Sequence, residues 1–380
     1  MGVTRPWRLP RWTEVRELHR GRCGRIVLAW PDPVPERRDG AADGGDAGGA
    51  AGEPDGSGTG QVRPAVVRYV PARLLVHRAR ATAFRADVDR LGGLRLPEAA
   101  VPYMFVQAPA FRAAYERSGA AVGGALVSDA VEGTTLVRLL ESHRALSGPA
   151  ATVLFHDVLR ALAAAHARGT AHGDLRAGKV MVGSDGGVTV TGLGLAALTT
   201  GAPELRAPEL WRGTGVPTGP ADVYAAGCLL YLCLTGQPPF PVRQSFSLMS
   251  RHTTAPVPLA GVPAPLREPL AAGLMKDPER RPGAEALLTE TQRSVAPHWE
   301  EQGRSELGKL AMSLVEPLPR TPPRTSSTPL WPIRPAGRTT GFQPASRGRR
   351  RTPKSLVSTT YANPSQTGTV NAYSGGPAGR

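Results

Sequence analysis

Between residues 149 and 234 the hydrophobic pattern of the chain changes period, and this change limits the folds that the chain can adopt. Residues 149–168 place apolar side chains on one helical face and begin with a proline, which predicts an amphipathic helix. Short strands follow at 180–182 and 188–191, joined by a Ser-Asp-Gly-Gly turn. The apolar run 223–234 is too short to cross a bilayer and predicts a buried helix. We therefore expect helices to dominate this part of the chain, with further helices at about 265–275, 283–296 and 297–315.

Strand-like segments prevail before residue 131. A hairpin is expected where Gly21 and Gly24 interrupt an alternating pattern. This hairpin spans residues 18–29. The pattern also predicts a strand at 65–70, a short helix at 84–91 and a strand at 124–131. The N-terminal part therefore differs in character from the helical part that follows.

Residues 31–64 separate two of these strands and differ from both. Nine glycines lie between positions 40 and 60, and no large apolar side chain occurs between Val34 and Val62. A segment of this composition buries too little apolar surface to offset the entropy of ordering it. We expect it to be a flexible insertion in the loop between the strands.

Cysteine usage and charge bear on the compartment and the partners. Three cysteines without CxxC spacing indicate neither a disulfide framework nor a zinc site. No charged-then-apolar leader and no transmembrane segment are recognised, so a reducing cytoplasm is the expected location. The net charge is +15, but residues 317–380 hold ten Arg or Lys and no Asp or Glu. Much of the excess charge therefore belongs to a tail whose Pro, Ser and Thr content predicts disorder.

Several short motifs occur in a fixed order along the chain. They are His172-Gly173-Asp174-Leu175, Ala207-Pro208-Glu209, Asp222-Val223-Tyr224-Ala225-Ala226-Gly227, Leu234-Thr235-Gly236-Gln237-Pro238-Pro239-Phe240 and Asp277-Pro278-Glu279-Arg280-Arg281-Pro282. In this order they resemble the HRD loop, the APE motif, the start of the large buried helix, the segment that follows that helix and the closing segment of the protein kinase superfamily, in its bacterial eukaryotic-like (Hanks-type) Ser/Thr form. The resemblance covers residues 12–296, although His19 stands where the first glycine of the glycine-rich loop belongs.

The resemblance implies a bilobal α+β fold with a small antiparallel β N-lobe and a mainly helical C-lobe. The implied boundaries are 12–128 for the N-lobe with its insertion at 31–64, 129–296 for the C-lobe, 297–316 for a further helix and 317–380 for a disordered basic tail. The His-Gly-Asp form of the loop also occurs in aminoglycoside and choline phosphotransferases, which share the kinase core. Those relatives lack the APE segment and the Asp222-type helix start, so a small-molecule kinase is the minor alternative.

Most of the phosphoryl-transfer chemistry that the resemblance implies has been replaced. The family uses a strand Lys on the ATP phosphates and an Asp and an Asn on Mg²⁺. Here Arg68 stands at the strand position, Gly192 begins the segment that corresponds to DFG, and Lys179 stands at the Asn position. The first Asn of the whole sequence is Asn363. Both protein ligands for magnesium are missing, so we expect no metal site, and the chain resembles a degenerate pseudokinase.

ATP is the expected ligand if the pocket holds a nucleotide at all. The candidate nucleotide-binding residues are Gly21, Gly24, Ile26, Arg68 and Lys179, with direct pairing of cations and phosphate oxygens in place of a metal. The alternative is an empty pocket with Lys179 facing solvent. Asp174 is the candidate catalytic base, and its alternative role is to anchor the loop by hydrogen bonds.

Other residues have structural roles by resemblance. Asp87 is the candidate helix carboxylate that pairs with Arg68, and Asp89 would replace it if the helix is rotated. The remaining assignments are an ion pair between Glu209 and Arg281, a hold on the catalytic loop by Asp222, and an apolar column that stacks His172, Leu193 and Leu91.

Three functional hypotheses follow from this pattern. The first is a regulatory or scaffolding pseudokinase that binds a protein partner, such as an active kinase or its substrate. The second is an active Ser/Thr protein kinase that transfers the γ-phosphate of ATP with an atypical site, which the loss of several preorganised charges disfavours. The third concerns the basic cluster 347–354, which is suited to nucleic acid or anionic lipid, with a solvated extension as the alternative.

Overall fold

The structure is a computed structural model that describes residues 7–21, 23–33, 63–119, 121–199, 201–212, 216–241, 245–257 and 259–322. All of them belong to one compact unit, Met1–Thr325. Most of the expected insertion 31–64 and of the expected tail 317–380, including the basic cluster 347–354, lies outside the described residues. Within the described segments no helix has the length and apolarity that crossing a membrane requires.

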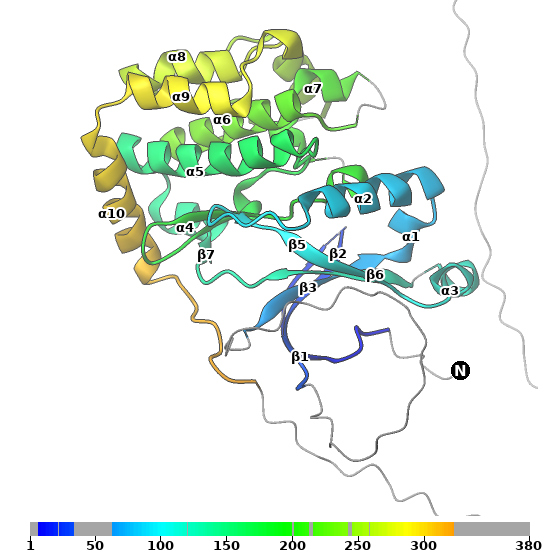
Figure 1. The fold of residues 1–380 in the computed structure, drawn as a ribbon. Coiled ribbons are helices and arrows are strands. Elements are labelled where there is room, and N and C mark those ends of the chain that lie inside the picture. The colour runs from blue at the N-terminus through cyan, green and yellow to red at the C-terminus, as the bar shows by residue number, and fades with distance from the viewer. Residues whose placement is uncertain are drawn as a thin grey trace, which may run out of the picture. The chain divides into compact units, whose positions relative to one another are not determined.

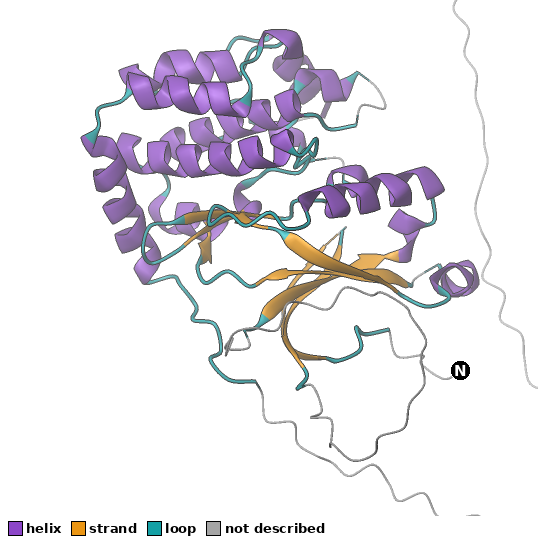
Figure 2. Ribbon diagram, in the orientation of Figure 1, coloured by secondary structure: helices purple, strands orange, loops and turns teal. Residues whose placement is uncertain are grey.

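An antiparallel sheet forms the N-terminal part (Figures 1 and 2). Its strand order is β1-β2-β3-β6-β5, and the strands are β1 (Trp12–Gly21), β2 (Gly24–Pro31), β3 (Ala65–Pro71), β6 (Val122–Asp129) and β5 (Pro102–Gln107). Three short or medium helices accompany it: α1 (Ala72–Leu75), α2 (Arg78–Leu91) and α3 (Phe111–Ser118). Figure 1 shows α2 between the sheet and the helices that follow, where Phe84 and Leu91 are fully buried. Alternate residues of β3 are buried, as expected for a sheet with one packed face.

Helices dominate the part after residue 133 (Figure 2). The α-helices are α4 (Leu136–His143), α5 (Gly148–Ala167), α6 (Gly219–Thr235), α7 (Ser245–Thr254), α8 (Ala264–Gly273), α9 (Ala284–Ser294) and α10 (His298–Met312). Short 3₁₀ turns are η1 (Ala177–Lys179), η2 (Ala196–Leu198), η3 (Pro203–Leu205), η4 (Pro208–Trp211) and η5 (Pro278–Arg280). A small sheet of order β4-β9-β8-β7 consists of β4 (Ala99–Ala100), β9 (Val188–Thr191), β8 (Val180–Val182) and β7 (Thr134–Thr135).

The helical core is built around α5 and α6. Ser147 caps α5, because its hydroxyl accepts a hydrogen bond from the amide of Ala150 at 3.2 Å, and Pro149 occupies the first turn. Phe155, Leu162 and Tyr224 are almost completely buried. Burial of each such apolar side chain contributes about 1.5–3 kcal/mol relative to exposure, so this core holds the surrounding loops in place.

The α+β fold with an N-terminal antiparallel sheet and a later helical region confirms the expected class. The strands at 180–182 and 188–191 begin and end as predicted, while the predicted helix at 84–91 begins earlier, at Arg78. Helices α3, α4 and α7 and strand β5 were not predicted. Strand β5 has no alternating burial, and α4 is amphipathic but only eight residues long, which is short for recognition by its apolar period.

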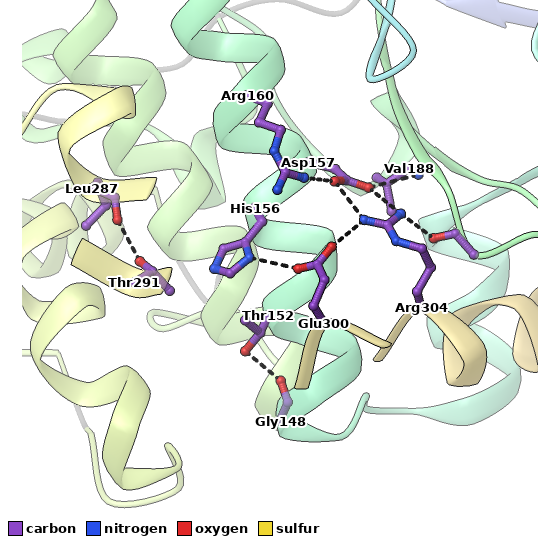
Figure 3. Close-up of polar contacts among 11 residues, drawn as sticks. Gly148, Thr152, His156, Asp157, Arg160, Val188, Leu287, Thr291, Glu300 and Arg304 are labelled. Atoms are coloured by element: carbon purple, nitrogen blue, oxygen red, sulfur yellow. Dashed lines mark hydrogen bonds and ion pairs between the residues drawn. The ribbon is translucent and has the colours of Figure 1, made fainter. Parts of the chain in front are cut away.

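Helix α10 lies against α5 through a partly buried polar network (Figure 3). The Asp157 side chain is 3% exposed and accepts hydrogen bonds from Arg304 at 3.0 Å and from the amide of Val188 at 3.3 Å. Glu300 accepts from Arg304 at 2.6 Å and lies 3.2 Å from Nδ1 of His156. Because Arg160 of α5 also pairs with Asp157 at 2.5 Å, removing α10 would take away one of the two cations that pair with this buried carboxylate.

Close backbone packing at Gly303 provides a test of this arrangement. A Cβ at Gly303 would lie 2.2 Å from the carbonyl oxygen of Pro149 on α5. Alanine favours helices over glycine, but here we expect Gly303→Ala to destabilise the fold by about 1–3 kcal/mol, because the added methyl group clashes with backbone. Thermal unfolding followed by circular dichroism measures the change, with the exposed neighbour substitution Gln302→Ala as the control. A Gly303→Ala protein as stable as the control would contradict the packing.

Candidate functional site

A cavity of about 490 Å³ lies between the N-terminal sheet and the helical part. Its apolar lining comes from both sides, with Leu18, Ile26 and Val66 from the strands of the sheet and Met181 and Leu193 from the segments below. Ligand pockets in proteins have this size and this mainly apolar lining. Of the lining residues, sequence reasoning identified Ile26 but missed Val66 and Met181, which occupy partly buried positions of β3 and β8.

A second cavity, of about 610 Å³, is rich in basic side chains. Its charged lining residues are Arg68, Arg73, Arg80, Arg176 and Lys179 on the basic side and Asp174 and Glu204 on the acidic side. His19 also lines this cavity. Burial lowers the pKa of its imidazole, and repulsion from Arg176, Lys179 and Arg68 lowers it further. The arrangement is suited to an anion.

The glycine turn between β1 and β2 is held in place by β3. Gly21 and Gly24 pair across the hairpin, and Gly24 has a φ of +105°. A Cβ at Gly24 would lie 1.8 Å from the carbonyl oxygen of Tyr69, so only glycine fits. Ile26 faces Arg68 across the β2–β3 pair, which places the turn, the apolar lining and the strand cation side by side.

Arg68 has neither a hydrogen bond nor an ion pair with any described residue. Burial lowers the pKa of its guanidinium, although the group remains charged at neutral pH. The expected pairing with Asp87 is wrong, because Asp87 instead accepts a hydrogen bond from Arg90 at 2.5 Å. Arg90 lies three residues after Asp87 on the same helix, so the two side chains are neighbours on the helix surface. Asp89 is exposed on that helix and also makes no ion pair with Arg68.

Asp174 lies between two cations. Its carboxylate is 3.5 Å from Nε of Arg176 and 4.0 Å from Nζ of Lys179. Its backbone amide donates a hydrogen bond to Nδ1 of His172 at 3.2 Å. The carboxylate therefore balances local positive charge in the absence of a ligand.

Lys179 is buried in the lining of the basic cavity. The residue is 5% exposed, and within the described residues its ammonium has the single contact to Asp174. A Cβ at Gly192 would lie only 3.0 Å from Nζ of Lys179, so any residue larger than glycine would compete with the ammonium for space. Burial, followed by the repulsion of Arg68, lowers the pKa of Lys179 to about 8, while Asp174 opposes the shift. The alternative prediction, in which Lys179 faces solvent, is wrong.

The residues at this site do not fit a magnesium ion. Mg²⁺ takes oxygen ligands in octahedral geometry, and the described residues that line the basic cavity provide two carboxylates, that of Glu204 and, beside Lys179, that of Asp174. Arg176 and Lys179 already surround that carboxylate, and Gly192 has no donor atom. A divalent cation placed there would be repelled by the two fixed positive charges.

The loop that carries Asp174 is fixed by Asp222 at the start of α6. One carboxylate oxygen accepts from the amide of His172 at 2.7 Å and lies 3.0 Å from Nε2 of His166, and the other accepts from the amide of Gly173 at 2.8 Å. Asp222 is 2% exposed, so these charge-assisted bonds replace its hydration. Gly173 adopts a φ of +71°, which the sharp turn of the loop requires.

The His172 side chain continues this loop into the core. The residue is fully buried, and desolvation lowers the pKa of its imidazole, so the ring is neutral. Nδ1 accepts from Asp174, which leaves the proton on Nε2 to donate to the carbonyl oxygen of Thr191 at 3.1 Å. Leu193 and Leu91, the other members of the expected column, are both fully buried in the same core cluster.

Arg281, which lies between η5 and α9, contacts the segment before α6. Its guanidinium donates two hydrogen bonds of 2.6 Å to the carboxylate of Glu209 and others to the carbonyl oxygens of Met275 and Pro220. The Arg281 side chain is completely buried, and this bidentate geometry satisfies its charge. Glu209 and Arg281 therefore contribute to the fold and do not face the cavities.

Comparisons with known proteins agree with this geometry. The protein kinase domain family matches residues 112–291. The Ser/Thr protein kinase PkaA of Streptomyces coelicolor is 36% identical over 178 residues, which are 43% of this chain and 33% of that protein. PknH of Mycobacterium bovis is 32% identical over 40% of this chain and 28% of that protein, and PknE of Mycobacterium tuberculosis is 31% identical over 40% and 29%.

The matched region has defined limits. The chain spans about a third of the length of these curated relatives. The family match begins at residue 112, after the strand that carries Arg68, and includes the loop of Asp174, α6 and Arg281. Residues 112–291 of this chain are therefore similar to protein kinase domains, with bacterial Ser/Thr protein kinases among the similar proteins.

Proposed function

We propose that the chain is a pseudokinase that binds an adenine nucleotide without a metal ion and acts as a regulatory or scaffolding module. In this proposal, residues 12–128 are its N-lobe and residues 129–296 its C-lobe. The observation that carries the proposal is the buried ammonium of Lys179. Its Nζ lies 3.0 Å from the position that a Cβ at residue 192 would occupy. A fixed cation lies in a basic cavity of about 610 Å³, where a kinase would require magnesium.

The two cavities together match the two ends of a nucleotide. The first is apolar and large enough for a base and a sugar, and the second is basic and suited to phosphate groups. Protein kinase domains in general bind ATP. Arg68 and Lys179 have no hydrogen-bond acceptor among the described residues, so phosphate oxygens would satisfy both cations.

The same arrangement disfavours phosphoryl transfer. Transfer depends on preorganised charge at the moving phosphoryl group, and loss of one such group commonly costs a factor of about 10²–10³ in rate. Three differ here, because Arg68, Lys179 and Gly192 replace the strand Lys and both metal ligands. The remaining architecture, including the holds by Asp222 and Arg281, supports a role in binding.

Metal-free binding of ADP tests the proposal. We expect the full chain to bind ADP in the presence of EDTA, and we expect Lys179→Met to weaken this binding roughly ten- to hundredfold, because a charge-assisted hydrogen bond is lost. Titration calorimetry measures the affinity, and Lys309→Met, which removes an exposed lysine of α10, is the matched control. Melting temperatures separate weaker binding from a failure to fold. Binding that requires Mg²⁺, or equal affinities of the Lys179 and Lys309 variants, would contradict the proposal.

The low pKa of Lys179 predicts how binding depends on pH. The ammonium is charged below its pKa of about 8 and loses its proton above it, so ADP affinity should be constant near neutral pH and fall as pH rises through about 8. Calorimetry at a series of pH values from about 7 to about 10 measures the profile, and bound phosphate will shift the midpoint upward by linkage. Lys179→Met should have a flat profile in this range. A wild-type profile that is equally flat would exclude Lys179 from the phosphate contacts.

Substitution of Asp174 distinguishes the two main hypotheses. In a metal-free site its carboxylate repels phosphate, so we expect Asp174→Asn to increase ADP affinity by about two- to tenfold. Isothermal titration of both proteins in EDTA measures this change. If instead the wild-type chain hydrolyses or transfers the γ-phosphate of ATP with Mg²⁺ and Asp174→Asn abolishes this reaction, the chain is an active kinase.

A further inference from the structure

The chain returns to the first cavity after α10. Helix α10 ends at Met312, and the following segment runs from the helical part towards the N-terminal sheet (Figure 1, orange). Leu314 and Val315 pack against the helical core, and Glu316 forms an isolated antiparallel bridge with Gly133. We call residues 313–322 the strap.

Glu316 is held by two arginines from distant parts of the chain. Nη1 of Arg16, on β1, donates to one carboxylate oxygen at 2.6 Å, and Nη1 of Arg138, on α4, donates to the other at 3.0 Å. These hydrogen bonds, that of Arg16 first, lower the pKa of Glu316. An exposed ion pair is weak by itself, but here two pairs and a backbone bridge act on one residue. The carboxylate therefore connects the strap to the sheet and to the helical part at once.

The strap forms one wall of the cavity. Arg16, Arg138, Glu316 and Leu318 all line it, and about 490 Å³ remain free with the strap in place. A segment that blocked the cavity would leave no such volume, so the strap encloses the space without filling it. Lys179 lines the other, basic cavity, so the strap and Lys179 contact opposite ends of any nucleotide that spans both.

We propose that the strap is the outer wall of the nucleotide pocket and that Glu316 is the positioning residue that keeps it there. This inference rests on the proposed function, because it assigns the base and sugar of the nucleotide to the strap end of the pocket. Binding and docking are then linked: a nucleotide that contacts the wall stabilises the docked strap, and release of the strap weakens nucleotide binding by the same factor.

The test measures binding of adenosine and of ADP to the full chain in EDTA. In Glu316→Lys both ion pairs become repulsions, so both ligands should bind about fivefold more weakly. Glu301→Lys makes the same charge change at an exposed position of α10 and should leave both affinities unchanged. A second substitution, Arg138→Glu, in the Glu316→Lys protein restores one attractive pair and should recover part of the affinity. Lys179→Met should weaken ADP and not adenosine, which distinguishes the wall from the phosphate contacts.

Hydrogen exchange of the strap distinguishes failure of this inference from failure of the proposed function. We expect the amides of 313–322 to be protected in the wild-type chain, more protected with ADP, and exposed in Glu316→Lys. The proposal that the strap is a wall of the pocket would be overturned if the wild-type and Glu316→Lys proteins bound both ligands equally well. It would also be overturned if Glu316→Lys lost ADP binding and kept adenosine binding. An unprotected strap would overturn it too. A different result would overturn the proposed function alone. In that case the strap is protected in the wild-type chain and released in Glu316→Lys, which supports its docking through Glu316, but the chain binds neither ligand.

Discussion

The buried carboxylate of Asp222 is the contact on which the arrangement of the site depends. Hydrogen bonds to charged groups contribute about 1.5–3 kcal/mol each, and Asp222 accepts from two consecutive backbone amides of the loop that carries Asp174. The apolar core around α6 keeps this carboxylate in place, so the loop geometry follows from the packing of a helix more than forty residues later in the chain. Without that hold, Asp174 would lose its place beside Lys179.

Lys179 places a buried positive charge at the centre of the site. Burying an ammonium is costly, and the lowered pKa of Lys179 reflects that cost. The space that it occupies exists because position 192 is glycine, and its nearest counter-charge is Asp174. The lysine, the glycine and the aspartate therefore form one unit in which the cation is part of the chain. A metal ion would duplicate that charge.

Sequence patterns predicted those parts of the structure that depend on local order or on motifs. The helix at 149–168, the strands at 180–182 and 188–191 and the residues around Asp222 follow from apolar period and motif order. The partner of Arg68 was predicted wrongly, since the choice of carboxylate depends on helix rotation and on the competing Arg90. Ile26 was the lining residue that the glycine hairpin indicated, but Val66, Met181 and the strap had no signal, because contacts between residues up to 300 positions apart leave no pattern in the intervening sequence.

The contact between Glu316 and Arg16 joins the first strand of the sheet to the last described segment of the chain. Loop closure over 300 residues is entropically costly, so the sheet and the helical core are expected to form before it does. During synthesis the first strand leaves the ribosome long before residue 316, and domains fold in order of emergence. The first cavity would thus stay open on one side until translation has passed the strap, and a chain interrupted before that point would carry a folded core whose cavity lacks one wall.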